Sequence, residues 1–320
     1  MGVTTSNPAV LLAAARRGER TAVARLLSLI ERGGEPAREV GRLAHPDSGE
    51  AYTVGLTGAP GAGKSTLTSS VVGHLRGLGE EVAVLAIDPS SPFTGGAILG
   101  DRVRMQDHAT DPGVFIRSMA TRGHLGGLAL ATPEAVRLLD ALGRRWVLIE
   151  TVGVGQVEVE VAGKADSTVV VVNPGWGDSV QANKAGLMEV ADVFVINKAD
   201  RKGADATRSD LEQMLDLSDL PAGAWRPPIV ATVATEGKGA GEVWDAVLAH
   251  RDHATASGEL ARRRAFRAAE ELRQIVAHRL GERARQLCTG ERWDDVVDSV
   301  RVQERDPYDA ADELLAGVGA

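Results

Sequence analysis

The chain has 320 residues, of which 43% are hydrophobic and 25% are charged, values that are ordinary for a folded globular protein. Its 36 Lys and Arg residues against 44 Asp and Glu residues give a formal net charge of −8. This balance argues against nucleic-acid binding, which favours a basic surface. The single cysteine, Cys288, excludes an intramolecular disulfide framework and any CxxC metal or redox motif.

The sequence predicts no membrane-spanning segment. It has no apolar run of about 18 residues, the length needed for a membrane span, and the N-terminus lacks the apolar core of a signal peptide. Together with the single cysteine, this predicts a reducing compartment without membrane association. We expect the cytoplasm, or the mitochondrial matrix if the source is eukaryotic.

Residues 1–50 are predicted to form an N-terminal helical extension. Apolar residues recur on one face at the 3.6-residue period over 8–32, which predicts one helix there. Gly33-Gly34 is expected to end it. Residues 35–50 are polar and contain two prolines, so we expect a connector.

Residues 51–250 contain seven short runs rich in Val, Ile and Leu, separated by turn residues or helix-like stretches. Nearly continuous apolar runs without polar alternation are typical of strands buried on both faces of a parallel sheet. We therefore predict an α/β domain with a mostly parallel central sheet. The predicted strands are Tyr52–Thr57, Val82–Ile87, Val114–Ile116, Trp146–Ile149, Thr168–Val172, Val193–Ile196 and Ile229–Val233.

Residues 251–320 are predicted to form a third, helical unit. A long helix is expected over 259–287, a second around 293–302 and a third around 307–315. The apolar positions of the long helix could pack on the sheet domain or on another chain. The sheet domain already has two covered faces, so we predict that this arm makes a dimer.

A phosphate-binding loop follows the first predicted strand. The pattern GxxxxGK[ST] lets glycine backbones turn around phosphate oxygens, and the following helix adds the positive end of its dipole. Lys64 is expected to reach the β- and γ-phosphates and the Ser65 hydroxyl to bind Mg²⁺. The predicted loop comprises Gly58, Ala59, Pro60, Gly61, Ala62, Gly63, Lys64, Ser65 and Thr66.

The base is predicted from Asn197-Lys198-Ala199-Asp200, which follows a buried strand and therefore lies at the ligand-binding edge of the sheet. The Asp200 carboxylate can accept hydrogen bonds from N1–H and the exocyclic amine of guanine, a donor pair that adenine lacks. Asn197 can reach the N7/O6 edge, and the Lys198 stem can cover the ring. Val233 and Ala234, after the last strand, are expected to offer a backbone N–H to guanine O6.

Three acidic residues are candidates for the metal and for catalysis. Glu150 ends a predicted strand and is expected to contact Mg²⁺. The Gly153 N–H is expected to donate to the γ-phosphate. Asp88 also ends a strand and suits a metal contact or the activation of water. Asp101 lies in a loop that could reach Mg²⁺. No glutamine follows Gly153 directly, so we expect slow intrinsic hydrolysis that a partner accelerates.

These motifs together resemble the MeaB/ArgK family of P-loop GTPases, which are chaperones of adenosylcobalamin-dependent acyl-CoA mutases. The resemblance covers residues 8–316. The matching stretches are Gly58–Thr66, Asp88–Pro92, Gly95–Met105, Ile116–Gly127, Glu150–Gln156, Asn173–Lys184 and Asn197–Asp200. The stretch Asn173–Lys184 departs from the family at Trp176 and Asn183, and we expect Trp176 to lie outside the core.

The resemblance implies a SIMIBI-type P-loop GTPase fold, with N-terminal helices and a C-terminal helical extension that forms a homodimer. It implies that Lys64, Ser65, Asp88, Asp101 and Glu150 form the phosphate–Mg²⁺ cluster. Asp178 and Lys184 would lie in a partner-responsive loop. It further implies GTP hydrolysis to GDP, and a chaperone that gates cofactor loading and protects or reactivates the mutase. Methylmalonyl-CoA mutase is the first expected partner.

Two alternatives share the phosphate-binding loop. A P-loop kinase or ATPase linked to amino-acid transport would use arginines to close over the phosphates, but it rarely needs to discriminate guanine. A metallochaperone GTPase would need a cluster of His or Cys residues, whereas the seven histidines here are scattered through the sequence.

Overall fold

The computed structural model describes residues 7–88, 106–108, 110–120, 125–151, 164–176, 189–217, 221 and 223–316. The chain divides into two compact units, Met1–Ala265 and Phe266–Ala320. Residue 251, where we expected the helical arm to begin, lies inside a helix of the first unit, α10 (Ala240–Ala256).

The N-terminal extension differs from the sequence prediction. Instead of one helix and a connector, it has three helices, α1 (Pro8–Arg16), α2 (Arg20–Arg32) and α3 (Gly34–Ala44). Gly18, at a φ of +90°, breaks the predicted helix, because its backbone adopts a conformation that favours glycine. The segment predicted as a connector is helical because Ala37, Val40 and Ala44 bury one face of it.

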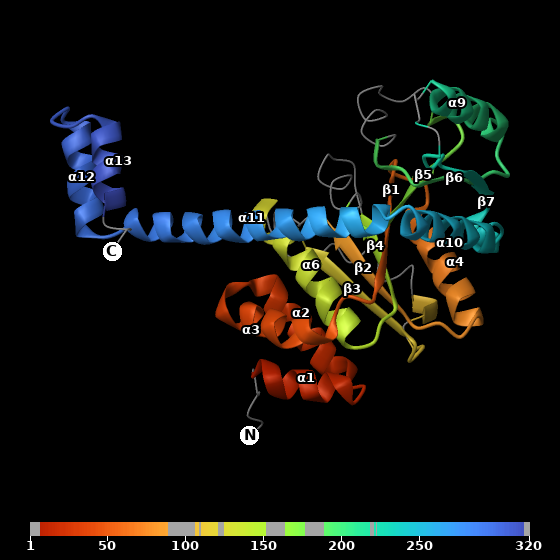
Figure 1. Cartoon of the computed structure of the whole chain (residues 1–320), viewed down its shortest axis with the longest axis horizontal. Helices are drawn as coiled ribbons and strands as arrows, with labels where there is room; N and C mark the ends of the chain where they lie inside the picture. The colour runs from red at the N-terminus through yellow and green to blue at the C-terminus, as the bar shows by residue number, and fades with distance from the viewer. Residues whose placement is uncertain are drawn as a thin grey trace. The chain divides into compact units, whose positions relative to one another are not determined.

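The sheet has seven strands in the order β3-β2-β4-β1-β5-β6-β7, and every described pairing is parallel. All seven predicted strands are confirmed, and the sheet is the P-loop type of α/β fold (Figure 1). Since the strands are parallel, all their carboxyl ends lie at one edge of the sheet. The strands are β1 (Tyr52–Gly58), β2 (Val82–Asp88), β3 (Val114–Ala120), β4 (Trp146–Thr151), β5 (Ser167–Val172), β6 (Val193–Asn197) and β7 (Ile229–Thr232).

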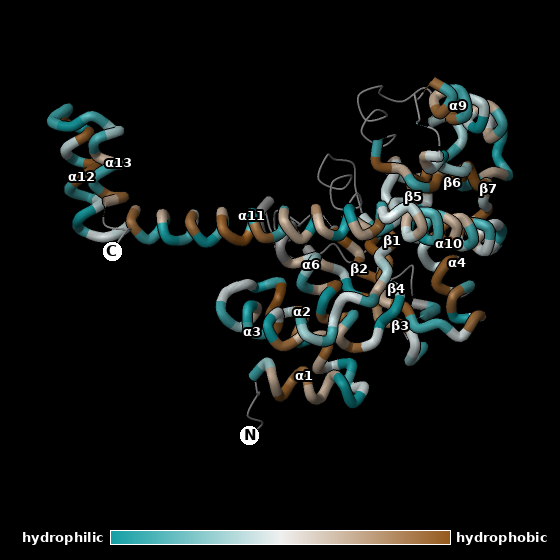
Figure 2. Tube along the Cα trace, in the orientation of Figure 1, coloured by the Kyte–Doolittle hydropathy of each residue, from teal (hydrophilic) through white to brown (hydrophobic). Residues whose placement is uncertain are grey.

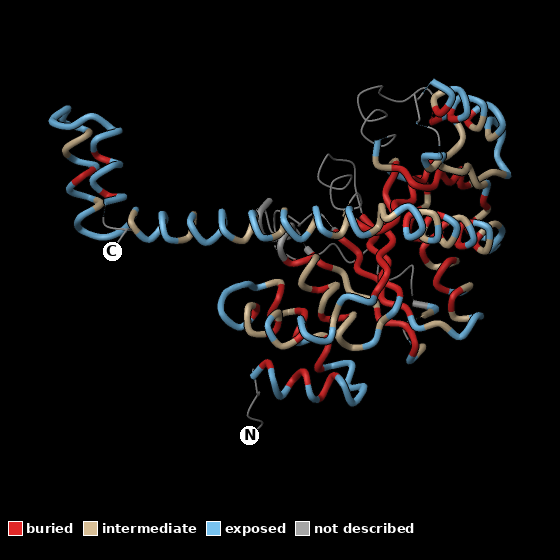
Figure 3. The backbone as a smooth tube through the Cα atoms, in the orientation of Figure 1, coloured by how far each residue is buried: buried red, intermediate tan, exposed pale blue. Residues whose placement is uncertain are grey.

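Helices cover both faces of this sheet, which explains why its strands lack polar alternation. In β4, Val147 and Ile149 pack under the N-terminal helices and α6 (Leu125–Ala141). The alternate residues Trp146 and Leu148 pack under α4 (Lys64–Gly77) and α10. A smaller cluster joins β5 and β6 to α9 (Ala204–Asp216). Figure 3 shows the resulting continuous buried interior along the strands.

The second unit contains most of α11 (Glu259–Leu287), followed by α12 (Glu291–Arg301) and α13 (Pro307–Ala316). All three helices confirm the sequence prediction. Val296, Ala310 and Leu314 form the small core between α12 and α13. Hydrophobic residues recur along α11 among polar ones (Figure 2), and several of them are exposed.

The other regular elements in the part of the chain that the structure describes are the short 3₁₀ helices η1 (His45–Asp47), η2 (Gln106–His108) and η4 (Ala234–Glu236). Among the described residues, no helix combines the length and the apolar character that a membrane span requires.

Leu148 tests the central position of β4. The strand β4 lies between β1 and β2, and the Leu148 side chain is fully buried at 0% exposure, so Leu148→Ala should lower the free energy of unfolding by about 2–5 kcal/mol. Leu217 is 86% exposed and serves as the control, for which Leu217→Ala should cost less than about 0.5 kcal/mol. Urea unfolding followed by circular dichroism measures both. Equal losses in the two variants would contradict this assignment of the core.

Candidate functional site

The loop between β1 and α4 has a conformation that only glycine fits at two of its positions. Gly58 has a φ of +137°, and a Cβ there would lie 1.9 Å from the Val171 carbonyl oxygen on β5. Gly63 has a φ of +91°, and a Cβ there would lie 2.4 Å from the Asn197 Nδ2 atom. The sequence therefore lets the loop turn tightly into α4 while it approaches two neighbouring strands.

Lys64 and Ser65 begin α4 and are both largely buried. The Lys64 ammonium donates to the carbonyl oxygens of Gly58 at 2.9 Å and Ala59 at 3.2 Å, so it lies against the loop. The Ser65 hydroxyl donates to Glu150 Oε1 at 2.5 Å. The structure therefore brings together one cation and two oxygen ligands that lie far apart in the sequence.

Glu150 belongs to β4, one of the two strands that flank β1. It lies in register with Leu56 of β1, and its side chain is fully buried. A hydroxyl and a carboxylate are hard oxygen donors of the kind that Mg²⁺ prefers. Ser65 and Glu150 therefore fit a Mg²⁺ site beside the phosphate-binding loop.

Asn197, at the end of β6, connects three segments of the site. Its amide nitrogen donates to the Ala62 carbonyl oxygen at 2.8 Å. Its Oδ1 accepts from the Thr232 hydroxyl and the Ala234 N–H, each at 3.1 Å. This buried side chain ties the end of β6 to the phosphate-binding loop and to the segment after β7.

Lys198 follows in a left-handed conformation, with a φ of +58° that is uncommon for a residue other than glycine. Its ammonium donates to the Gly61 carbonyl oxygen at 2.6 Å. Asp200, by contrast, is exposed. The predicted base-binding motif thus has two residues held against the phosphate-binding loop and a carboxylate that is open to solvent.

The backbone predicted to contact guanine O6 makes bonds within the protein. The Val233 N–H donates to the Lys238 carbonyl oxygen at 3.1 Å, and the Ala234 N–H donates to Asn197. A contact from either N–H to a base would have to share or replace these bonds. The contact stays a prediction.

Several predicted site residues lie outside what the structure describes. They are Asp101, Gly153, Asp178 and Lys184. The backbone of Asp88 ends β2, in register with Ala120 of β3. The metal, phosphate, catalytic and partner roles expected for these residues stay predictions.

The expectation that Trp176 lies outside the core is wrong. Its side chain is only 5% exposed and packs with residues of β5, β6 and α9. The chain turns sharply after β5, with the Trp176 N–H donating to the Asn173 carbonyl oxygen at 3.1 Å. The Gly175 N–H donates to the Thr207 hydroxyl of α9 at 3.3 Å. These contacts accompany burial of the ring, although Trp176 lies in a stretch rich in glycine and aspartate.

Two hydrogen bonds of the site were not predicted from the sequence. Thr232, which belongs to the segment expected beside the base, is buried and donates to Asn197, and Ser70 of α4 donates to the Ala234 carbonyl oxygen at 2.7 Å. The Thr232 bond could have been anticipated, because this residue ends a strand parallel to β6. Ser70 carries no comparable sequence signal.

Comparisons with known proteins show which family the chain resembles. The family described as Methylmalonyl Co-A mutase-associated GTPase MeaB matches residues 23–288. A Pyrococcus abyssi protein that carries GTPase in its name is 51% identical, with 94% of this chain and 93% of that protein covered. The GTPase ArgK of Escherichia coli is 39% identical, with 81% of this chain and 80% of that protein covered.

Two further relatives extend the comparison. The mouse protein named methylmalonic aciduria type A homolog, mitochondrial, is 36% identical, with 78% of this chain and 64% of that protein covered. The solved structure of a protein titled LAO/AO transport system kinase aligns over 100% of both chains, with a TM-score of 0.72 and 26% identity.

Asn197 tests the geometry of the site. Asn197→Ala removes three hydrogen bonds and leaves buried groups of the loop and of β7 unsatisfied, at a cost of about 1–3 kcal/mol. GDP affinity, measured by fluorescence titration, should therefore fall by about tenfold or more. Gln213→Ala, an exposed amide on α9, is the control and should bind GDP as the unaltered chain does. Unchanged affinity in Asn197→Ala would show that this residue does not organise the site.

Proposed function

Since the chain belongs to the family of methylmalonyl-CoA mutase-associated GTPases, we propose that this GTPase is a switch that serves an adenosylcobalamin-dependent acyl-CoA mutase. Methylmalonyl-CoA mutase is the first candidate partner. In this proposal the GTPase gates cofactor loading and protects or reactivates the mutase. The observation that carries the proposal is the hydrogen-bonded connection of Asn197 and Lys198 to the phosphate-binding loop. In the proposal, this connection would link recognition of the base to recognition of the phosphates.

The residues of the site suggest how the chain handles GTP. Lys64 would exchange its bonds to the loop carbonyls for bonds to the β- and γ-phosphates. Ser65 and Glu150 would hold Mg²⁺, with Asp88 and Asp101 proposed as further contacts. Bound Mg²⁺ neutralises charge on the phosphates. Asp200 would accept the two guanine donors, which fits its exposed position after β6.

Hydrolysis requires a water aligned with the γ-phosphate, and the sequence lacks a glutamine directly after Gly153. We propose that unassisted turnover is slow, with Asp88 or Glu150 orienting the water. The partner would act on the segment containing Asp178 and Lys184. This segment follows β5, a strand that borders the phosphate-binding strand β1.

We also propose that the chain forms a homodimer through its C-terminal helices. On α11, Phe266, Leu272, Val276 and Leu280 are all about half exposed or more and fall within about a third of the helix circumference. Residues 291–316 carry nine acidic residues against three arginines, whereas 266–287 carry five arginines against three glutamates. These opposite charges favour packing of the acidic helices of one copy on α11 of another.

An alternative activity is a kinase, because the solved structure that aligns over the whole chain is titled as one. A kinase would transfer the γ-phosphate to a second substrate, whereas a switch transfers it to water. Guanine-directed residues after β6 favour the switch. The two activities are separated by following the phosphate.

The proposed role with a mutase is tested by measuring the rate of GTP hydrolysis. A cognate apo-mutase should raise the rate of phosphate release severalfold, and free amino acids should leave it unchanged. Asp178→Ala and Lys184→Ala should abolish the stimulation and keep the basal rate within a few-fold, because a residue that acts only through the partner is absent from the unassisted transition state. Glu212→Ala on α9 is the matched surface control. Transfer of phosphate from GTP to an added small molecule would refute the switch.

The dimer is tested by sedimentation of the full chain. Leu272→Glu places a charge on the exposed apolar stripe of α11, so the variant should sediment as a monomer. Gln274→Glu adds the same charge on the opposite side of the helix and should leave the dimer intact. A dimeric Leu272→Glu variant would place the interface elsewhere.

A further inference from the structure

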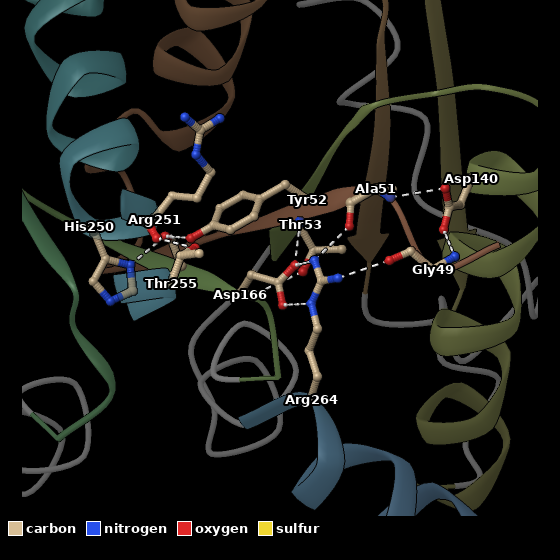
Figure 4. A network of polar contacts seen from close by, with 11 residues as sticks. Gly49, Ala51, Tyr52, Thr53, Asp140, Asp166, His250, Arg251, Thr255 and Arg264 are labelled. Atoms are coloured by element: carbon tan, nitrogen blue, oxygen red, sulfur yellow. Dashed lines mark hydrogen bonds and ion pairs between the residues drawn. The ribbon is translucent and has the colours of Figure 1, made fainter. Parts of the chain in front are cut away.

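The amino-terminal edge of the sheet, opposite the nucleotide site, carries a buried network of charged residues (Figure 4). Asp166 lies one residue before β5, and Asp192 lies one residue before β6. The two residues are only 1% and 4% exposed. Buried carboxylates require partners, since an uncompensated charge in the interior is strongly unfavourable.

Each aspartate makes the same pair of bonds with the neighbouring strand, one through its backbone N–H and one through its carboxylate. The Asp166 N–H donates to the Thr53 carbonyl oxygen, and the Thr53 N–H donates to Asp166 Oδ2, both at 3.0 Å. Asp192 repeats this with Thr168, at 2.9 and 2.8 Å. The two aspartates therefore extend the hydrogen-bond ladders of β1–β5 and β5–β6 beyond the strand ends, and so fix the register of three strands.

Two consecutive arginines of α11 hold these aspartates. Arg264 binds both oxygens of Asp166, at 3.1 and 2.8 Å, and also donates to the carbonyl oxygens of Gly49 and Ala51, each at 2.9 Å. Figure 4 shows its guanidinium between Asp166 and the chain that enters β1. Arg263 binds both oxygens of Asp192, at 3.1 and 3.0 Å. We call Arg263 and Arg264 the arginine joint.

Asp192 has a further partner in α10. His250 Nε2 lies 3.1 Å from Asp192 Oδ1, and His250 Nδ1 lies 2.6 Å from the Ser167 hydroxyl, which in turn bonds the Tyr52 hydroxyl at 2.7 Å. A serine, a histidine and an aspartate in a row resemble a hydrolytic triad. However, Ser167 and His250 are both 0% exposed, so no substrate can reach them. The row is a structural connection between the sheet and α10.

The three strands that the joint holds border the nucleotide site at their other ends, where β4 also contributes Glu150. β1 leads into the phosphate-binding loop, β5 leads to Asn173, and β6 leads to Asn197. Each strand has five to seven residues, which spans about 16–23 Å at about 3.3 Å per residue. We propose that the arginine joint makes the first turns of α11 respond to nucleotide, because opening of the joint and separation of these three strands are one event.

The physical basis of this coupling is linkage. Detaching α11 removes the guanidinium partners of two buried carboxylates that hold the strand register, so the strand ends open together with the helix. Nucleotide binds only the intact arrangement of the three carboxyl ends. It therefore suppresses this opening by a factor of 1 + [L]/Kd, where [L] is the free nucleotide concentration.

Hydrogen exchange followed by mass spectrometry tests the proposal on the full chain, with and without GDP and Mg²⁺ at about 100 times the Kd. Amides at 259–265 should exchange up to about 100-fold more slowly with nucleotide. In the Arg263→Gln/Arg264→Gln variant this nucleotide effect should vanish at 259–265 and persist in α4. Arg262→Gln is the matched control, because Arg262 is exposed and, among the described residues, its side chain donates to the Ser257 carbonyl oxygen alone.

The proposal would be overturned if GDP protects the amides of α4 in the unaltered chain but does not change the exchange rate of the amides at 259–265. A nucleotide effect that survives in the double glutamine variant would also overturn it. If that variant does not fold, the Arg263→Lys/Arg264→Lys variant keeps the charges and loses the paired guanidinium bonds. It should show a reduced nucleotide effect at 259–265, and an undiminished effect would likewise overturn the proposal. The test needs no mutase, so its result is independent of the proposed partner.

Discussion

The parallel pairing of β1 with β4 on one side and β5 on the other is the constraint on which the rest of this structure depends. Pairing with β4 brings Glu150 within hydrogen-bond distance of Ser65. Pairing with β5 is so close at the end of β1 that Gly58 has no room for a Cβ. The conformation of the phosphate-binding loop therefore depends on β4 and β5. Its glycines are required because a side chain would clash with residues outside the loop.

Buried carboxylates have different partners at the carboxyl and amino edges of the sheet. At the carboxyl edge, Glu150 meets a hydroxyl group, an arrangement that suits a divalent cation. At the amino edge, Asp166 meets a guanidinium that binds both of its oxygens. Hydrogen bonding to Asp166, partly offset by burial, raises the pKa of Arg264 above its usual value. The carboxylate at the carboxyl edge is thus placed to bind a cation, whereas the carboxylate at the amino edge is already neutralised by an arginine of the protein.

The sequence was sufficient to predict the sheet, because strands covered on both faces leave an unmistakable apolar pattern. The phosphate-binding loop and the motif after β6 were also predicted, since each chemical role depends on residues that are neighbours in the chain. The helical character of residues 1–50 was predicted, but its division into three helices was not. The helices α1 and α2 share a periodicity that one long helix would also show, and the polar residues and prolines of 35–50 favoured a connector over α3. Trp176 was mispredicted because its burial depends on the turn at Asn173 and on α9.

The amino-edge network could not have been predicted, for a different reason. Arg264 lies 98 residues from Asp166, and Arg263 lies 71 residues from Asp192. In the sequence these arginines belong to a helix with many arginines, and nothing distinguishes them from exposed neighbours such as Arg262. Only the parallel order of β1, β5 and β6 brings both aspartates to the place where α11 begins.

This arrangement gives α11 two chemically distinct parts within one helix. Its first turns belong to the sheet unit and are held by ion pairs, whereas the stretch from Phe266 belongs to the second unit and exposes apolar residues. Burial opposes ionisation of Asp192, but bonds from His250 and Arg263 outweigh it and lower the pKa of this carboxyl. A carboxyl with a lowered pKa stabilises the fold above its unfolded pKa, and this contribution is lost as the pH falls through the folded value. Near neutral pH the Asp192 carboxyl is therefore ionised and paired with Arg263, so the start of α11 is tied to strands that border the nucleotide site.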